Sequence, residues 1–197
     1  MRMEPYLEDL LSEIHAWGKS HDAQQPEHAR RMLNLHPDTA RLASVLALSN
    51  RAASLLEVGT SNGYSTIWLA WAARVHGGRL ISIDHSAEKL EQADRNLCRA
   101  LLRDYVDLRH GDAADQLREL PGPFDFVLFD SVRMVPRKQM ELLLPKLTRN
   151  AVILADNALS HVAEMSSYVE LVCAQPDLFH IIVPVGKGLS VAYRKAA

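Results

Sequence analysis

From residue 54 onward, short apolar runs alternate with longer amphipathic stretches. Five of these runs are predicted to be strands, at 54–58, 79–84, 106–110, 124–129 and 151–155. Because helical stretches separate them, they are expected to lie parallel in one sheet with helices on both faces. Two more runs, 179–183 and 189–193, are joined by too few residues for a crossover helix and are expected to form an antiparallel hairpin. The pattern predicts a doubly wound, Rossmann-like α/β sheet that is mostly parallel, with a hairpin at its carboxyl end.

The first fifty residues have helical periodicity instead. One buried helical face is predicted from Leu7, Leu10, Leu11, Ile14 and Trp17, and the polar stretch 20–25 followed by Pro26 is expected to interrupt this helix. A second helix is expected to begin after Pro37, capped by Asp38 or Thr39, and to run to about residue 50. We therefore expect a single domain over 1–197, with an N-terminal helical cap (1–50) and an α/β core that binds a cofactor (51–197).

The composition narrows the possible partners. With 48% hydrophobic and 23% charged residues, the chain suits a globular domain with a sizeable core. The net charge is −2 and Lys and Arg are scattered, which argues against nucleic acid as a partner. The start of the chain lacks signal-peptide features and no apolar run is long enough to span a membrane, so we expect a cytoplasmic protein. Cys98 and Cys173 lack metal-ligand spacing and are expected to be reduced packing residues.

A glycine-punctuated turn joins the first predicted strand to a helix. Gly59 permits close backbone approach, and the free amides at the helix start attract an anion, with help from the Ser65 hydroxyl. The spacing is GxxxG and not the GxGxxG of dinucleotide sites. It favours S-adenosylmethionine, which has a carboxylate, an amine and a sulfonium but no pyrophosphate. The alternative is that the glycines serve only the shape of the turn.

The next two strand ends carry further candidates for this cofactor. Asp84 ends the second strand, where its carboxylate could accept hydrogen bonds from both ribose hydroxyls. The alternative for Asp84 is a capping role for the helix around 86–97. After the third strand, the Asp112 carboxylate and the Ala113 amide could meet an adenine edge. Three successive strand ends are thus expected to converge on one nucleoside.

The fourth and fifth strands end in oxygen donors. Asp130 follows one of them, and Asp156 and Asn157 follow the other. Hard divalent cations take such ligands and accept substrate oxygens in their open positions, so a vicinal diol could chelate there. Mg²⁺ is the expected ion, with Mn²⁺ and Ca²⁺ as alternatives. The simpler interpretation is that Asp130 and Asp156 only cap strand ends.

Several stretches in this order resemble one enzyme family, the cation-dependent O-methyltransferases that include catechol and caffeoyl-CoA methyltransferases, above all its small bacterial members. The matching stretches are 56–66, 83–93, 111–113, 124–130, 155–161 and 186–189. The resemblance implies a homodimer, a phenolic substrate, and metal ligands at Asp130, Asp156 and Asn157. It also implies cofactor contacts at Glu57, Gly59, Thr60, Ser65, Asp84 and Ala113. To these candidates we add three residues from the same strand ends, Ser61, Asp112 and Asp130.

The chain departs from this family just after Asp130. Val132 replaces an acid, Pro136 stands where the family often has a tyrosine, and Arg133 occupies the position of a lysine often credited with base catalysis. An arginine stays protonated, so Arg133 is expected to orient and stabilise the phenolate while the metal held by Asp130 promotes its deprotonation. We therefore predict Arg133 and Asp130 as the catalytic residues.

Other interpretations stay open at this point. A nicotinamide-dependent dehydrogenase would use a similar sheet, and a regulatory or scaffold module would bind the cofactor without catalysis. His161 could face the substrate, although an ordinary surface or capping role is the simpler one. The sequence Gly186-Lys187-Gly188 is expected to form only the hairpin turn.

Overall fold

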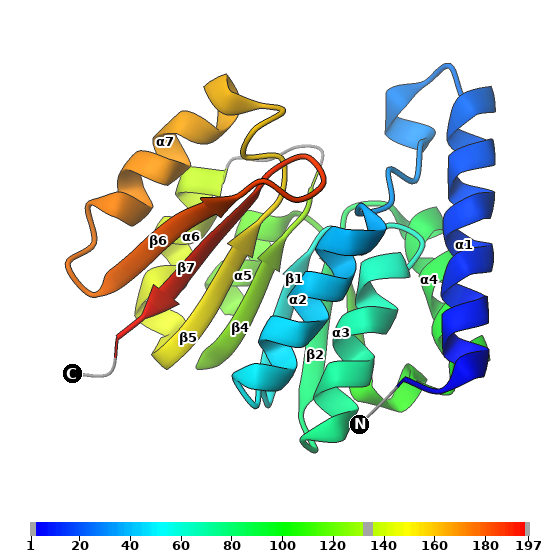
Figure 1. Ribbon diagram of the computed structural model, residues 1–197, viewed down its shortest axis with the longest axis horizontal. Coiled ribbons are helices and arrows are strands. Elements are labelled where there is room, and N and C mark those ends of the chain that lie inside the picture. The colour runs from blue at the N-terminus through cyan, green and yellow to red at the C-terminus, as the bar shows by residue number, and fades with distance from the viewer. Residues whose placement is uncertain (1–2, 132–135, 196–197) are drawn as a thin grey trace.

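Seven strands form one sheet in the order β3-β2-β1-β4-β5-β7-β6 (Figure 1). The computed structural model describes residues 3–131 and 136–195. The strands are β1 (Ser54–Val58), β2 (Arg79–Asp84), β3 (Val106–His110), β4 (Phe124–Phe129), β5 (Leu147–Ala155), β6 (Leu178–Val183) and β7 (Leu189–Arg194). The first five are parallel, and β7 is antiparallel to both β5 and β6. The predicted fold class, including the hairpin, is confirmed.

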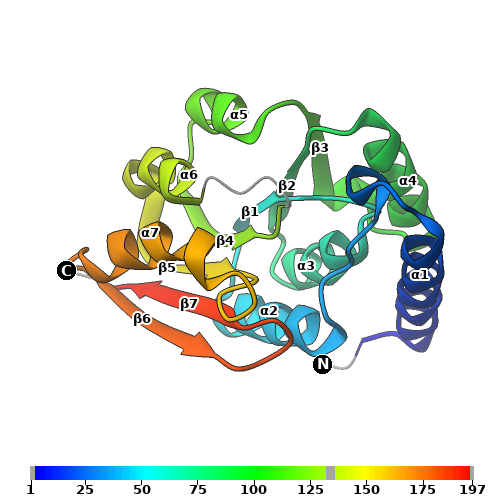
Figure 2. The ribbon, with the colours of Figure 1, turned by 90° about the horizontal axis from the view of Figure 1, so that it is seen from above.

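Helices cover both faces of this sheet, as Figure 2 shows from above. The α-helices are α1 (Pro5–Gln24), α2 (Pro37–Ser49), α3 (Tyr64–Val75), α4 (Ala87–Arg99), α5 (Ala113–Glu119), α6 (Pro136–Leu143) and α7 (Val162–Cys173), and the short 3-10 helices are η1 (His28–Arg30), η2 (Arg103–Tyr105) and η3 (Leu144–Lys146). One apolar core lies between the sheet and α1 to α4, and a second lies between the sheet and α5 to α7. The central parallel strands β1 and β4 are therefore buried on both faces, as a parallel sheet requires.

The N-terminal helix differs from its prediction at two points. It continues through the polar residues 20–24 and ends at Gln24. The next residue, Gln25, has the extended backbone that the following Pro26 favours. Trp17 is not part of the buried face, because its side chain is 43% exposed and stacks on His21. The other four predicted positions are buried. Proline, not polarity, therefore sets the end of this helix.

Two further local predictions are wrong. The second helix begins at Pro37, the first-turn position that proline tolerates best, and its cap is His36, whose Nδ1 accepts from the Asp38 amide at 3.3 Å. Neither Asp38 nor Thr39 caps it. Cys98 and Cys173 are free thiols as expected, but both are exposed and do not serve as packing residues. Within residues 3–131 and 136–195, no helix is long and apolar enough to span a bilayer.

Candidate active site

A cavity of about 530 Å³ opens at the carboxyl edge of the parallel strands. Residues at or just past the ends of the five parallel strands line it, namely Gly59, Asp84, Gly111, Asp130 and Asn157. The cavity lies at the end of β1, which has β2 on one side and β4 on the other, so that the order of the strands reverses at this point. Ligands of doubly wound sheets bind at such a switch point.

The loop after β1 packs too closely for any side chain at its first glycine. Gly59 has a φ of 109°, and a Cβ there would collide with the backbone oxygen of Asp130. The amides of Gly59 and Thr60 both donate to the carbonyl of Ile83, at 2.9 and 3.3 Å. The glycine therefore lets the first loop lie directly on the ends of β2 and β4, where Gly59, Thr60, Ser61 and Ser65 all line the cavity.

Glu57 lies behind this loop and is fully buried. Its carboxylate accepts hydrogen bonds from the hydroxyls of Ser65, Thr66 and Ser82, each at 2.6 Å. Burial raises the pKa of Glu57 to about 7, although the three donors oppose the rise. Direct contact between Glu57 and a cofactor stays a prediction. Through its hydrogen bond, Glu57 orients the hydroxyl of Ser65, and Ser65 lines the cavity.

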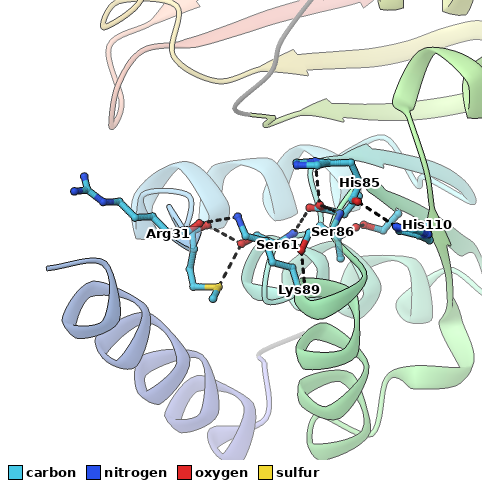
Figure 3. A network of polar contacts seen from close by, with 10 residues as sticks. Arg31, Ser61, His85, Ser86, Lys89 and His110 are labelled. Carbon is cyan, nitrogen blue, oxygen red and sulfur yellow. Dashed lines mark hydrogen bonds and ion pairs between the residues drawn. The ribbon is translucent and has the colours of Figure 1, made fainter. Parts of the chain in front are cut away.

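Asp84 is held by the backbone around it. One carboxylate oxygen accepts from the Ser61 amide at 2.8 Å and the other from the Ser86 amide at 2.9 Å (Figure 3). The cap of α4 is Ser86, whose hydroxyl accepts from the Lys89 amide at 3.3 Å, so the capping alternative for Asp84 is wrong. The carboxylate faces the cavity and is only 8% exposed.

Asp112 caps α5, since its Oδ1 accepts from the amides of Ala114 and Asp115 at 2.8 and 3.1 Å. Asp112 and Ala113 both line the cavity, in line with the expected convergence of three strand ends. Their contact with an adenine ring stays a prediction, because a cap and a ligand group can be the same residue.

The connection between α1 and α2, residues 25–36, forms a wall of the cavity that sequence reasoning missed. Figure 3 shows how it is tied down: Lys89 Nζ donates to the carbonyl of Arg31 at 2.6 Å, and the Ser61 hydroxyl donates to that of Met32 at 2.6 Å. The Asp22 carboxylate accepts from the amides of Met32 and Leu33, at 2.6 and 2.8 Å. No periodic apolar pattern marks this segment, so the sequence carried no signal for its role.

The predicted metal ligands come together at the other end of the cavity. Asp130 and Asn157 line it, and Asp156 beside them is 2% exposed. Burial raises the pKa of both carboxyls, and the charge of Asp156 raises that of Asp130 further. Oδ1 of Asp156 is buried with no hydrogen-bond partner among the described residues. Two carboxylates and one amide are thus available; no group of three His, Cys, Asp or Glu in the described chain could hold a metal.

Several site predictions have other outcomes. Arg133 and Val132 lie outside the described residues, and Pro136 is the first residue of α6. His161 lines the cavity just ahead of α7, with its Nδ1 2.8 Å from the Ser160 hydroxyl. Lys187, expected to belong only to a turn, also lines the cavity.

Comparison with known proteins agrees with this architecture. Residues 56–158 match the model of a family described as a methyltransferase domain. The catechol O-methyltransferase of Niastella koreensis is 32% identical over 131 residues, which are 64% of this chain and 59% of that protein. The catechol O-methyltransferase of Mycobacterium tuberculosis is 36% identical over 116 residues, 58% of this chain and 52% of that protein. The match thus spans little more than half the length of these relatives.

A solved structure extends the similarity to nearly the whole chain. The O-methyltransferase from Bacillus cereus, in complex with SAH, matches with a TM-score of 0.81 at 28% identity and covers 95% of this chain and 91% of that one. The strand order, the glycine loop and the cavity at the strand ends are those expected of such an enzyme. Since the matched family model covers more than half of its length, this chain belongs to the methyltransferase domain family.

Proposed function

We propose that this protein is an S-adenosylmethionine-dependent O-methyltransferase that uses a divalent cation and acts on a phenolic vicinal diol. The observation that carries the proposal is one cavity in which three strand ends suited to a nucleoside adjoin Asp130 and Asn157, with the buried Asp156 beside them. The names of the similar proteins support transfer to an oxygen of a catechol.

The cofactor half of the cavity has a group for each part of the molecule. Ser65, held by Glu57, and the amides at the start of α3 suit the methionine carboxylate. Asp84 suits the ribose hydroxyls, and Asp112 with Ala113 suits the adenine edge. When bound, S-adenosylmethionine supplies the methyl group, and these residues would hold the cofactor in the part of the cavity that adjoins Asp130. Such positioning accounts for a large part of the rate in a two-substrate transfer.

The acidic half of the cavity fits a divalent cation. A buried oxygen without a partner, such as Oδ1 of Asp156, is costly, and two adjacent buried carboxylates repel each other. A cation held by Asp130, Asp156 and Asn157 would relieve both costs; we expect Mg²⁺, with Mn²⁺ and Ca²⁺ as alternatives. When bound, it supplies Lewis-acid activation of a phenolic oxygen. Arg133 is proposed to orient and stabilise the resulting phenolate.

Methyl transfer from labelled S-adenosylmethionine to catechols, flavonoids and hydroxycinnamoyl esters tests this function, with the methylated oxygen identified by NMR. A labelled O-methyl product with at least one diol is expected. Failure with every acceptor, in protein that binds the cofactor, would favour the scaffold module that binds it without catalysis. Binding of NADH in place of S-adenosylmethionine would favour the dehydrogenase.

The homodimer is likewise proposed, and light scattering measures the mass of the protein in solution.

Calorimetric titration with Mg²⁺ tests the cation site without relying on turnover. Asp156→Asn removes one ligand charge and is expected to weaken binding at least tenfold. Glu91→Gln, which changes an exposed acid on α4, is the matched control and should bind like the wild type. Equal affinity for all three proteins would contradict the proposed ligand set.

A further inference from the structure

Lys187 lies between Gly186 and Gly188 in the turn that joins β6 to β7, the red loop of Figure 1. Its carbonyl oxygen accepts hydrogen bonds from the backbone amides of Leu159 and Ser160, both at 3.0 Å. These two residues lie two and three positions after the predicted metal ligand Asn157. The turn is therefore fastened to the loop that carries those ligands.

The glycines on either side hold the turn in a narrow slot. Both have positive φ angles, 57° at Gly186 and 88° at Gly188. A Cβ on Gly186 would collide with the Thr39 hydroxyl at the start of α2, and one on Gly188 would collide with Leu159. Because the turn is packed on two sides, the backbone position of Lys187 is well defined.

From this position Lys187 lines the cavity together with Asp130, Asn157 and His161. Burial raises the pKa of Asp130 and of Asp156, and the positive charge of Lys187 is among the effects that lower both. The ammonium group therefore lies within electrostatic range of the whole predicted cation site.

The ammonium of Lys187 has no hydrogen bond or ion pair to any residue in 3–131 or 136–195. A divalent cation between Asp130 and Asp156 would balance both carboxylate charges. Lys187 would then be left with an uncompensated positive charge in the wall of the acceptor site, where an anionic group gains a charge-assisted hydrogen bond.

We propose that Lys187 selects acceptors that carry a carboxylate, which its ammonium binds while the two hydroxyls of the acceptor face Asp130 and Asn157. The inference rests on the proposed function, since it places a diphenol in the same cavity. A lysine present only to balance the acids would act equally on every acceptor. The two roles therefore differ in their dependence on the charge of the acceptor.

Protocatechuate and its methyl ester are matched probes, because both are vicinal diphenols and only the first carries a carboxylate. We expect Lys187→Met to raise the KM for protocatechuate about tenfold, to leave the KM for the ester within about twofold, and to change kcat little for either. Lys187→Glu should reverse the preference in favour of the ester. The control is Lys195→Met, a change at the residue that directly follows β7 and is not part of the cavity wall.

Calorimetry with each probe, in the presence of SAH and Mg²⁺, gives the same comparison without turnover. A selective loss of protocatechuate binding in both Lys187 variants supports the inference. Equal losses for acid and ester, or none, would overturn it while the proposed function stands. If the wild type neither binds nor methylates any diphenol, the proposed function itself is contradicted, and this inference with it.

Discussion

Glu57→Gln is a test of how the buried carboxyl behind the cofactor loop is ionised. Glu57 is fully buried, accepts three hydroxyl hydrogen bonds and has a pKa raised to about 7. Burial and the nearby Asp84 favour the protonated form, whereas the donors Ser65, Ser82 and Thr66 favour the ionised form. Glutamine has nearly the same shape and cannot ionise, so it isolates the effect of the charge.

The sign and size of the effect follow from the two pKa values. Below pH 4.5 the Glu57 carboxyl is protonated in both the folded and the unfolded chain, and the folded state bears no ionisation cost. As the pH rises from 4.5 to 7, only the unfolded chain releases the proton, so the free energy of unfolding falls. The complete loss is about 3 kcal/mol, of which about 2 kcal/mol falls between pH 5.5 and 8. Between pH 5.5 and 8, the free energy of unfolding of Glu57→Gln should therefore rise by about 2 kcal/mol relative to that of the wild type.

Urea denaturation of the cofactor-free protein at pH 5.5 and pH 8 measures this difference. The comparison of variant with wild type cancels the contributions of other titrating groups. Glu91→Gln is the control and should keep a constant difference from the wild type. If the difference for Glu57→Gln is also the same at both pH values, the three hydroxyl donors outweigh burial, and Glu57 is ionised throughout.

Three further predictions concern the cofactor and the acceptor. Asp84→Ala should weaken S-adenosylmethionine binding by roughly 1–3 kcal/mol and leave Mg²⁺ affinity nearly unchanged, and calorimetry showing wild-type cofactor affinity would remove Asp84 from the site. Lys89→Met loses the 2.6 Å hydrogen bond to the carbonyl of Arg31 and should speed SAH release, measured by stopped flow, about tenfold. The control Lys19→Met, at an exposed lysine, should not change the release rate, and equal rates for the two variants would mean that residues 25–36 do not retain the cofactor. Arg133→Met should lower kcat by about tenfold to a thousandfold, while Arg133→Lys keeps much of the rate. If Arg133→Met shifts the acidic limb of the pH profile by more than about one unit, Arg133 takes part in deprotonation.

The strands were predictable where both faces of the sheet are covered. The bounds of β1 to β4 match the predicted ranges. In β1 and β4, burial on two sides leaves a nearly continuous apolar run, whereas β3 lies at the edge of the sheet and mixes apolar with polar residues. β5 begins four residues before its predicted start, since Arg149 and Asn150 are exposed strand residues that an apolar run does not include. Local patterns thus locate the buried part of an element better than its solvent-facing end.

The site was predictable where topology alone brings residues together. Asp84 ends a parallel strand, Asp130 and Asn157 each follow one, and parallel strands end at one edge of the sheet. Lys187 could not be placed in this way, because it reaches the cavity through the fit of two glycines against α2 and Leu159. The same holds for Lys89, whose bond to Arg31 joins segments 58 residues apart.

Cation dependence of methyl transfer is the most direct test of the central claim, that Asp130, Asp156 and Asn157 form the reactive end of a cofactor cavity. With labelled S-adenosylmethionine and protocatechuate, excess chelator should abolish O-methylation, and added Mg²⁺ should restore it in the wild type but not in Asp156→Ala. Full activity in excess chelator would contradict the account and leave a methyltransferase that works without a metal.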